Sequence, residues 1–259
     1  MAEQPDGILL IGHGTRDAEG TREFFQLADL LAKCLYPHPV AGCLLEFQQP
    51  TIAEGWRSLV DQGVRHVRVA PLLLFAAGHA RQDIPRAIVA CAAETPGVTH
   101  SQSGPLSRAP SIIRLLGDRI EQAAAESDMS LGRETALVAV GRGSYDPCAQ
   151  ADMQVLGQVV ARRAGLIHHA VGFYAMAQPR LPDVLDRVAS RPEVRQVIVQ
   201  PHLLFQGRLY DAIVQQVDQA AQRHRQVRFV VGRYLGPNEA VAQAVARRVL
   251  VGPEPVVVS

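Results

Sequence analysis

The stretch Arg68-Val-Ala-Pro-Leu-Leu-Leu-Phe-Ala-Ala-Gly-His79 decides the fold that this sequence predicts. Its apolar run is too short for a helix of its own, and it ends in small residues followed by an imidazole, as a fully buried strand does. In open α/β sheets, ligands bind at the carboxyl ends of the strands. His79 is therefore expected at a ligand-binding sheet edge. A lone histidine there is more often structural, so its role depends on what else reaches that edge.

The residues around this stretch alternate between strand and helix patterns. Strands are expected at 7–12, 40–47, 68–75 and near 98, and helices at 21–35, 51–63, 83–94 and 110–125. The second of these helices opens with Thr51-Ile-Ala-Glu54, a capping box. Such alternation predicts parallel βαβ units with right-handed crossovers, and thus a four-stranded doubly wound α/β sheet.

The second half of the chain repeats the first. Residues 137–144, 172–179 and 201–208 echo residues 9–15, 42–50 and 71–79, in the same order and at an offset of 129 or 130 residues. Three ordered matches at a nearly constant offset predict an internal duplication. Two homologous lobes are expected, at 1–125 and 135–259, joined by the polar linker 126–134. Because one chain then holds both lobes, the duplication is compatible with a monomer.

The composition points to an ordinary globular protein. Of 259 residues, 47% are apolar and 20% are charged, and the formal net charge is +1. Such a balance gives no case for a nucleic-acid or membrane partner attracted by bulk charge. The four cysteines lack zinc-finger and iron–sulfur spacing, which favours reduced thiols. No signal-peptide pattern or membrane-length apolar run is seen, so a cytoplasmic protein is expected.

Three potential metal ligands are expected at one edge of the first sheet. His13 follows the first strand, Glu46 closes the second, and His79 follows the third. Two imidazoles and a carboxylate favour a divalent transition metal, and so few ligands leave coordination positions open. In the structural alternative, His13 orients a loop and Glu46 pairs with Arg16 or Arg81.

The duplicated half lacks these ligands. Arg142 stands in place of His13, Ala175 in place of Glu46, and Arg208 in place of His79. No second metal site is expected there. The two guanidinium groups could recognise anionic groups bidentately, or they could reflect drift after duplication.

A family resemblance rests on these motifs. The His-Gly-Thr-Arg16 segment, the Glu46 that precedes Gln-Gln-Pro50, and the 71–79 stretch followed by Asp83-Ile-Pro85 resemble the sirohydrochlorin chelatases of the CbiX type. The resemblance spans both halves, as in the long two-domain form of the family. It implies two α/β lobes around a cleft and the insertion of a divalent metal ion into a tetrapyrrole without ATP. No permanently bound cofactor is implied.

The resemblance also implies residue roles. His13 and His79 would hold the metal ion and pass it to the macrocycle, and Glu46 would accept protons and guide the metal. The implied substrate, sirohydrochlorin, carries eight carboxylates. Candidate partners for them are the arginines in or near the matching loops: Arg16, Arg81, Arg142, Arg208 and Arg233.

Several alternatives stay open at this point. Co²⁺ is the favoured ion, with insertion for cobalamin synthesis, while Fe²⁺ for siroheme or Ni²⁺ would suit the same ligands. A non-catalytic tetrapyrrole or metal carrier and a two-lobed solute-binding protein are the other classes considered. The pair His168-His169 could attract a metal ion at the surface, but it lies before the strand that ends at Ala175 and is interpreted as structural.

Overall fold

The computed structural model describes residues 6–75, 82–106 and 109–251 of the chain. Two parallel sheets of four strands each are present in these residues. The first contains β1 (Gly7–Gly12), β2 (Val40–Leu44), β3 (His66–Pro71) and β4 (Thr99–Gln102), in the order β2-β1-β3-β4. The second contains β5 (Thr135–Gly141), β6 (His168–Phe173), β7 (Gln196–Pro201) and β8 (Arg228–Val231), in the order β6-β5-β7-β8. The predicted fold class is confirmed.

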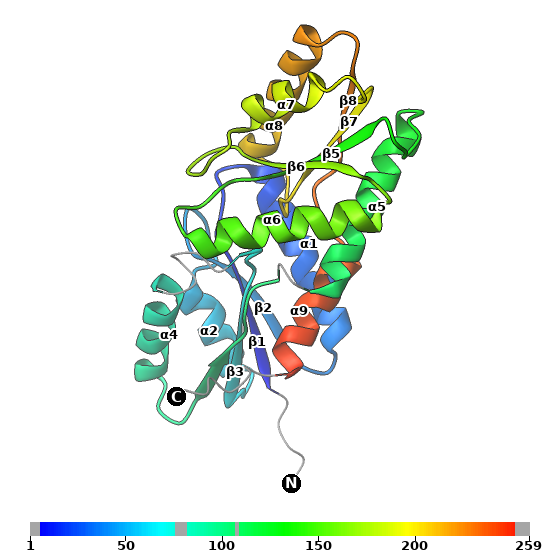
Figure 1. Cartoon of the computed structure of the whole chain (residues 1–259). Helices are drawn as coiled ribbons and strands as arrows, with labels where there is room; N and C mark the ends of the chain where they lie inside the picture. The colour runs from blue at the N-terminus through cyan, green and yellow to red at the C-terminus, as the bar shows by residue number, and fades with distance from the viewer. Residues whose placement is uncertain (1–5, 76–81, 107–108, 252–259) are drawn as a thin grey trace, which may run out of the picture. The chain divides into compact units, whose positions relative to one another are not determined.

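Helices cover both faces of each sheet (Figure 1). The helices of the first repeat are α1 (Ala18–Leu35), α2 (Ile52–Asp61), α4 (Asp83–Glu94) and α5 (Pro110–Glu126). Those of the second repeat are α6 (Pro147–Arg163), α7 (Leu181–Ala189), α8 (Arg208–Arg223) and α9 (Glu239–Val251). None of the helices in the described part of the chain has the length and apolar character that a membrane span requires.

Local capping signals explain where the first two helices begin. The predicted capping box is present, since the Thr51 hydroxyl accepts from the Glu54 N–H and the Glu54 carboxylate accepts from the Thr51 N–H. Helix α1 starts three residues before the predicted Thr21, because the Asp17 side chain accepts a hydrogen bond from the Gly20 N–H at 3.0 Å. This earlier start brings the helix close behind the loop that follows β1.

The compact units of the chain do not coincide with the predicted lobes at 1–125 and 135–259. Helix α5 belongs with β5–β8 and α6–α8, whereas the C-terminal helix α9 belongs with β1–β4, α1, α2 and α4. Helix α5 packs on α6, β7 and β8, and α9 packs on α1 and β3. The predicted linker 126–134 thus lies inside the second unit. The sequence reveals that a helix has an apolar face, but it does not reveal which sheet that face packs on.

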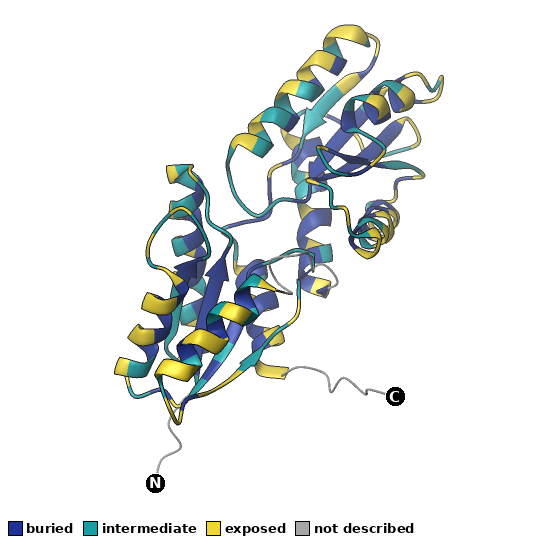
Figure 2. Ribbon diagram, turned by 90° about the vertical axis from the view of Figure 1, so that its left-hand side faces the viewer, coloured by how far each residue is buried: buried dark blue, intermediate teal, exposed yellow. Residues whose placement is uncertain are grey.

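Each unit has its own apolar core. In the first unit, Leu9, Ile11, Val67 and Val69 of the strands pack with Trp56, Leu59, Ile84 and Ile88 of α2 and α4. In the second, the strands pack with apolar side chains of α7 and α8. Figure 2 shows the strands as mostly buried, with exposed residues along the outer helix faces. The four cysteines are free, and burial raises the pKa of Cys43 to about 12.

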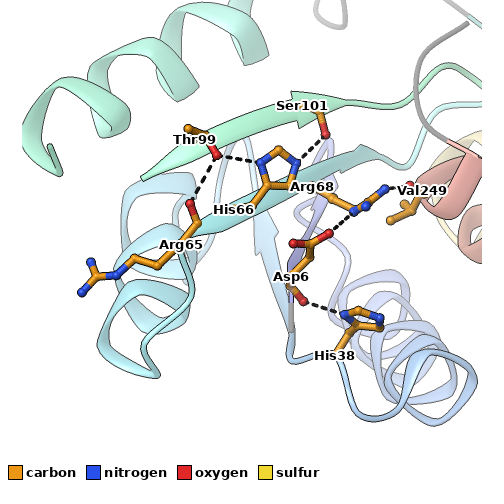
Figure 3. A network of polar contacts seen from close by, with 8 residues as sticks. All are labelled: Asp6, His38, Arg65, His66, Arg68, Thr99, Ser101 and Val249. Atoms are coloured by element: carbon orange, nitrogen blue, oxygen red, sulfur yellow. Dashed lines mark hydrogen bonds and ion pairs between the residues drawn. The ribbon is translucent and has the colours of Figure 1, made fainter. Parts of the chain in front are cut away.

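A polar network fixes α9 to the first unit at the opposite edge from the strand carboxyl ends (Figure 3). The Arg68 guanidinium pairs with the Asp6 carboxylate at 2.6 Å and donates to the carbonyl of Val249 in the last turn of α9 at 2.8 Å. The His66 ring lies between the hydroxyls of Thr99 and Ser101, at 2.8 and 3.1 Å. Arg68 satisfies a helix carbonyl that has no partner within its own helix.

Candidate functional site

His13 and Glu46 lie next to each other at the carboxyl edge of the first sheet. The pairing of β1 with β2 continues beyond the strand ends, because the Leu45 N–H donates to the Gly12 carbonyl at 2.9 Å. The Glu46 N–H then donates to the His13 carbonyl at 3.1 Å. Both residues are half-buried. Two of the three predicted site residues are thus brought together by continuation of the sheet.

Close backbone approach shapes this pair of loops. Gly14 has φ +92°, and a Cβ atom there would overlap the carbonyl oxygen of Glu46. Only glycine adopts this backbone at low cost while leaving room for the neighbouring chain. The Gln48 side-chain amide donates to the Thr15 carbonyl at 3.1 Å, which ties the second loop to the first. The positions of His13 and Glu46 are therefore set by main-chain contacts on either side of them.

Arg16 does not form the ion pair with Glu46 that was the structural alternative in the sequence analysis. Its guanidinium lies over the Phe47 ring, 5.0 Å from the ring centroid, rather than against Glu46. Arg16 and Phe47 are both exposed. The loop from Leu44 to Thr51 lines an open surface pocket to which Glu46 contributes. The first unit therefore has Glu46 and Phe47 along one open pocket and the Arg16 guanidinium over the Phe47 ring.

His79 and Arg81 lie outside the described residues. The chain can be followed beyond β3, where the Leu72 N–H donates to the Ile11 carbonyl at 2.8 Å. Within residues 6–75, 82–106 and 109–251, no group of three or more histidine, cysteine, aspartate or glutamate residues could hold a metal ion. Of the three predicted site residues, the structure therefore describes His13 and Glu46.

The second unit repeats the loop scaffold with different side chains. The Tyr174 N–H donates to the Gly141 carbonyl at 3.0 Å, and the Ala175 N–H donates to the Arg142 carbonyl at 2.8 Å. Gly143 has φ +94°, and a Cβ atom there would overlap the Ala175 carbonyl oxygen. These contacts match those of Gly12, His13, Gly14 and Glu46 one for one. Arg142 and Ala175 therefore occupy the backbone positions of His13 and Glu46, as the sequence repeat predicts.

Further arginines stand at the carboxyl edge of the second sheet. Arg208 is the first residue of α8 and is exposed. Arg233 follows β8, with its guanidinium 5.5 Å from the centroid of the Tyr234 ring. The sequence did not place Arg119 of α5 near Arg233. Burial, and then the neighbouring Arg233 guanidinium, lower the pKa of Arg119. No signal pointed to it, because α5 was assigned to the other lobe.

His168 and His169 lie away from this edge. They are the first two residues of β6, whereas Ala175 follows the end of that strand. The His168 ring nitrogen Nδ1 is 3.9 Å from the Glu193 carboxylate. Their position agrees with the structural interpretation.

Comparisons with known proteins agree with this arrangement. The CbiX family model matches twice, at residues 7–123 and 136–250, once in each repeat. A sirohydrochlorin ferrochelatase of Priestia megaterium is 29% identical over 94% of this chain and 89% of its own length. A sirohydrochlorin cobaltochelatase of the same organism is 28% identical over 88% and 74%. The structure of SirB from Bacillus subtilis with Fe³⁺ matches with a TM-score of 0.85 and 26% identity, over 95% of both chains. Because both repeats match the family model, this chain belongs to the CbiX family.

Proposed function

We propose that this protein inserts a divalent metal ion into sirohydrochlorin without ATP. One observation carries the proposal: two loop scaffolds with the same hydrogen bonds bear His13 and Glu46 in one unit, but Arg142 and Ala175 in the other. Since both pairs fit the same backbone, the side chains at these positions are free to serve a chemical role. An imidazole and a carboxylate suit metal delivery and proton removal, and the names of the relatives support a sirohydrochlorin substrate.

The reaction defines what these side chains must do. Metal insertion removes two pyrrole N–H protons while the nitrogens of the macrocycle replace the ligands of the ion. His13, together with His79, would bind the incoming ion, and a site with few protein ligands lets that ion leave again. Glu46 would accept the two pyrrole protons one after the other and release each to solvent, since it follows β2 next to His13 and lines an open pocket. The role of His79 rests on its place in the sequence, after β3.

Recognition of the substrate would involve the exposed arginines. Guanidinium groups bind carboxylates bidentately, and sirohydrochlorin carries carboxylates around its edge. Arg16 in the first unit and Arg142 and Arg208 in the second are proposed for this role. Arg81 has the same proposed role from its sequence position alone.

For the metal, Co²⁺ is the favoured substrate. Imidazole binds Co²⁺ more weakly than Ni²⁺ and more strongly than Fe²⁺, which combines capture with release. Iron is the second candidate, because a relative matched over 94% of this chain is named a ferrochelatase. Insertion assays in which Co²⁺, Fe²⁺ and Ni²⁺ compete under anaerobic conditions separate these ions. A dominant iron product would replace the cobalt proposal.

An absorbance assay tests the activity itself. Purified protein, sirohydrochlorin and Co²⁺ are mixed, and insertion is followed by the change in the tetrapyrrole spectrum. We expect His13→Ala and His79→Ala each to lower turnover at least about 100-fold, and Glu46→Gln to lower kcat more than substrate affinity. His168→Ala, at the opposite end of its sheet, is the matched control and should retain wild-type turnover.

Two outcomes would overturn the proposal. If the wild-type protein leaves insertion at its spontaneous rate, the chain is a tetrapyrrole or metal carrier. If His13→Ala and His79→Ala both insert metal at the wild-type rate, these residues are not metal ligands. The proposal extends to a cytoplasmic monomer, which cell fractionation and size-exclusion chromatography with light scattering would test.

A further inference from the structure

Phe47 is an exposed aromatic residue directly beside a proposed catalytic one. It follows Glu46 in the loop after β2, and 54% of its surface is exposed. Burial of an aromatic ring contributes much to the stability of a fold, and the exposed part of this ring makes no such contribution. The loop from Leu44 to Thr51 lines an open pocket, and Phe47 contributes to its wall. Glu46 and Phe47 therefore line the same pocket, where a ligand of Glu46 would lie.

The backbone at Phe47 also disfavours a large side chain. Its φ is 71°, in the left-handed region that costs non-glycine residues free energy. The Gln48 N–H donates to the Glu46 carbonyl at 3.0 Å across this turn. In the second unit Met176 has φ 58° at the equivalent place, so the loop imposes this conformation whatever residue it carries. Glycine would suit the backbone better, which means that folding does not explain the phenyl ring.

Arg16 adds a positive charge to the same surface. Its guanidinium lies 5.0 Å from the centroid of the Phe47 ring. Both side chains extend from loops whose backbones are tied together by the bond from Gln48 to the Thr15 carbonyl, at 3.1 Å. The guanidinium covers one face of the ring, and much of the Phe47 side chain stays exposed, so the pair can bind a ligand that has a flat apolar face and anionic groups at its edge.

We infer that Phe47 and Arg16 form a binding platform for the macrocycle of a carboxylated tetrapyrrole. The phenyl ring packs on a pyrrole-bearing face, and the guanidinium binds a peripheral carboxylate. The contact places the macrocycle nitrogens near Glu46, the neighbouring residue. This inference rests on the proposed function, because it assigns to Phe47 a contact with the substrate that is proposed there.

A glycine substitution separates binding from folding. Phe47→Gly removes the ring and relieves the backbone, so we expect a thermal midpoint equal to or above that of the wild type. The KM for sirohydrochlorin should rise about tenfold, as expected when an aromatic side chain that stacks on a planar heterocycle is removed. Because the ring contacts the substrate in both ground and transition states, kcat should change less than twofold. Phe47→Trp, which keeps a stacking surface, should retain the wild-type KM.

Direct binding gives a readout that does not depend on catalysis. Metal-free sirohydrochlorin is titrated into wild type, Phe47→Gly and the control Tyr36→Ala, and its absorbance is followed. Tyr36 is also an exposed aromatic residue of the first unit, at 87% exposure, but lies beyond the end of α1. Only Phe47→Gly should weaken binding about tenfold. Unchanged affinity and KM in Phe47→Gly would overturn the inference even if the enzyme inserts metal. If the wild type does not accelerate metal insertion, but Phe47→Gly still weakens the binding of sirohydrochlorin, the proposed function alone is overturned.

Discussion

A single methyl group added at Gly14 should change the geometry of the site without changing its proposed catalytic residues. The residue has φ +92°, and a Cβ atom there would overlap the backbone carbonyl oxygen of Glu46. A Gly14→Ala substitution changes none of the proposed catalytic residues. It nevertheless forces the loop after β1 away from the loop after β2, because the overlapping atom belongs to the main chain and cannot rotate aside.

The magnitude follows from two contributions. An alanine held in a left-handed backbone costs about 1–2 kcal/mol, and relief of the overlap requires a further shift of the loop. For a chain of this size each kcal/mol lowers the melting temperature by about 2–4 °C, so the backbone cost alone lowers it by about 2–8 °C and the loop shift lowers it further. A displacement of about 1 Å at reacting groups can cost about 100-fold in rate. Gly14→Ala should therefore lower kcat for metal insertion about 100-fold.

The second repeat supplies the matched control. Gly143 has φ +94° and faces the Ala175 carbonyl in the same way, so Gly143→Ala carries the same backbone cost. It should lower the melting temperature as much as Gly14→Ala does, but change kcat less than about twofold. Melting is measured by circular dichroism, and kcat by the absorbance of the metallated product. Equal losses of kcat in both variants, or normal kcat in Gly14→Ala, would refute the assignment of His13 and Glu46 as a pair that must be held in register.

Two further predictions concern the second unit. Arg142→Ala and Arg208→Ala should each raise the KM for sirohydrochlorin several-fold and leave kcat nearly unchanged, because they remove charge-assisted contacts to carboxylates; unchanged kinetics would remove them from the substrate site. Burial lowers the pKa of His202 to about 3, so the folded protein keeps a neutral ring while the unfolded chain binds a proton below about pH 6.5. Stability from this residue is therefore lost as the pH falls from about 6.5 to 3, and His202→Leu should reduce the loss. Leu72 is the equivalent residue of the first repeat, so leucine is a suitable replacement. The Leu72 N–H donates to the Ile11 carbonyl at 2.8 Å, as the His202 N–H donates to the Val140 carbonyl at 2.8 Å. Denaturant midpoints at pH 7 and pH 4.5 test this, and parallel losses in both proteins would contradict it.

The strands and the edge of the sheet were predictable because their signals are local. The apolar run of β3 and the order of the repeats predict parallel sheets, and parallel sheets gather residues that follow successive strands. His13 and Glu46 were placed in this way, and the structure brings them together. The repeat also predicts that Arg142 replaces His13, and the matching hydrogen bonds agree.

What the sequence could not predict depends on non-local packing or on backbone conformation. The assignment of α5 to the second unit and α9 to the first follows from which sheet each apolar face covers. A hydrophobic period shows only that a face is buried. Arg119 was missed for that reason. Phe47 was missed for another: its φ of 71° and its exposure arise from a turn that no glycine or asparagine marks in the sequence.

The two repeats show why such a site could diverge without loss of its scaffold. The contacts that shape each loop run between main-chain atoms, as in the bond from Glu46 to His13 and its counterpart from Ala175 to Arg142. The glycines at 14 and 143 complete both loops by making room for a carbonyl oxygen. Side chains at 13 and 142, and at 46 and 175, take no part in these bonds, so their replacement costs the backbone little. The two copies could therefore carry different side chains, His13 in one and Arg142 in the other, while both kept the same backbone. The difference between the two units is a difference of side-chain chemistry on one scaffold, which is why the paired glycine variants test the site more sharply than removal of the ligands.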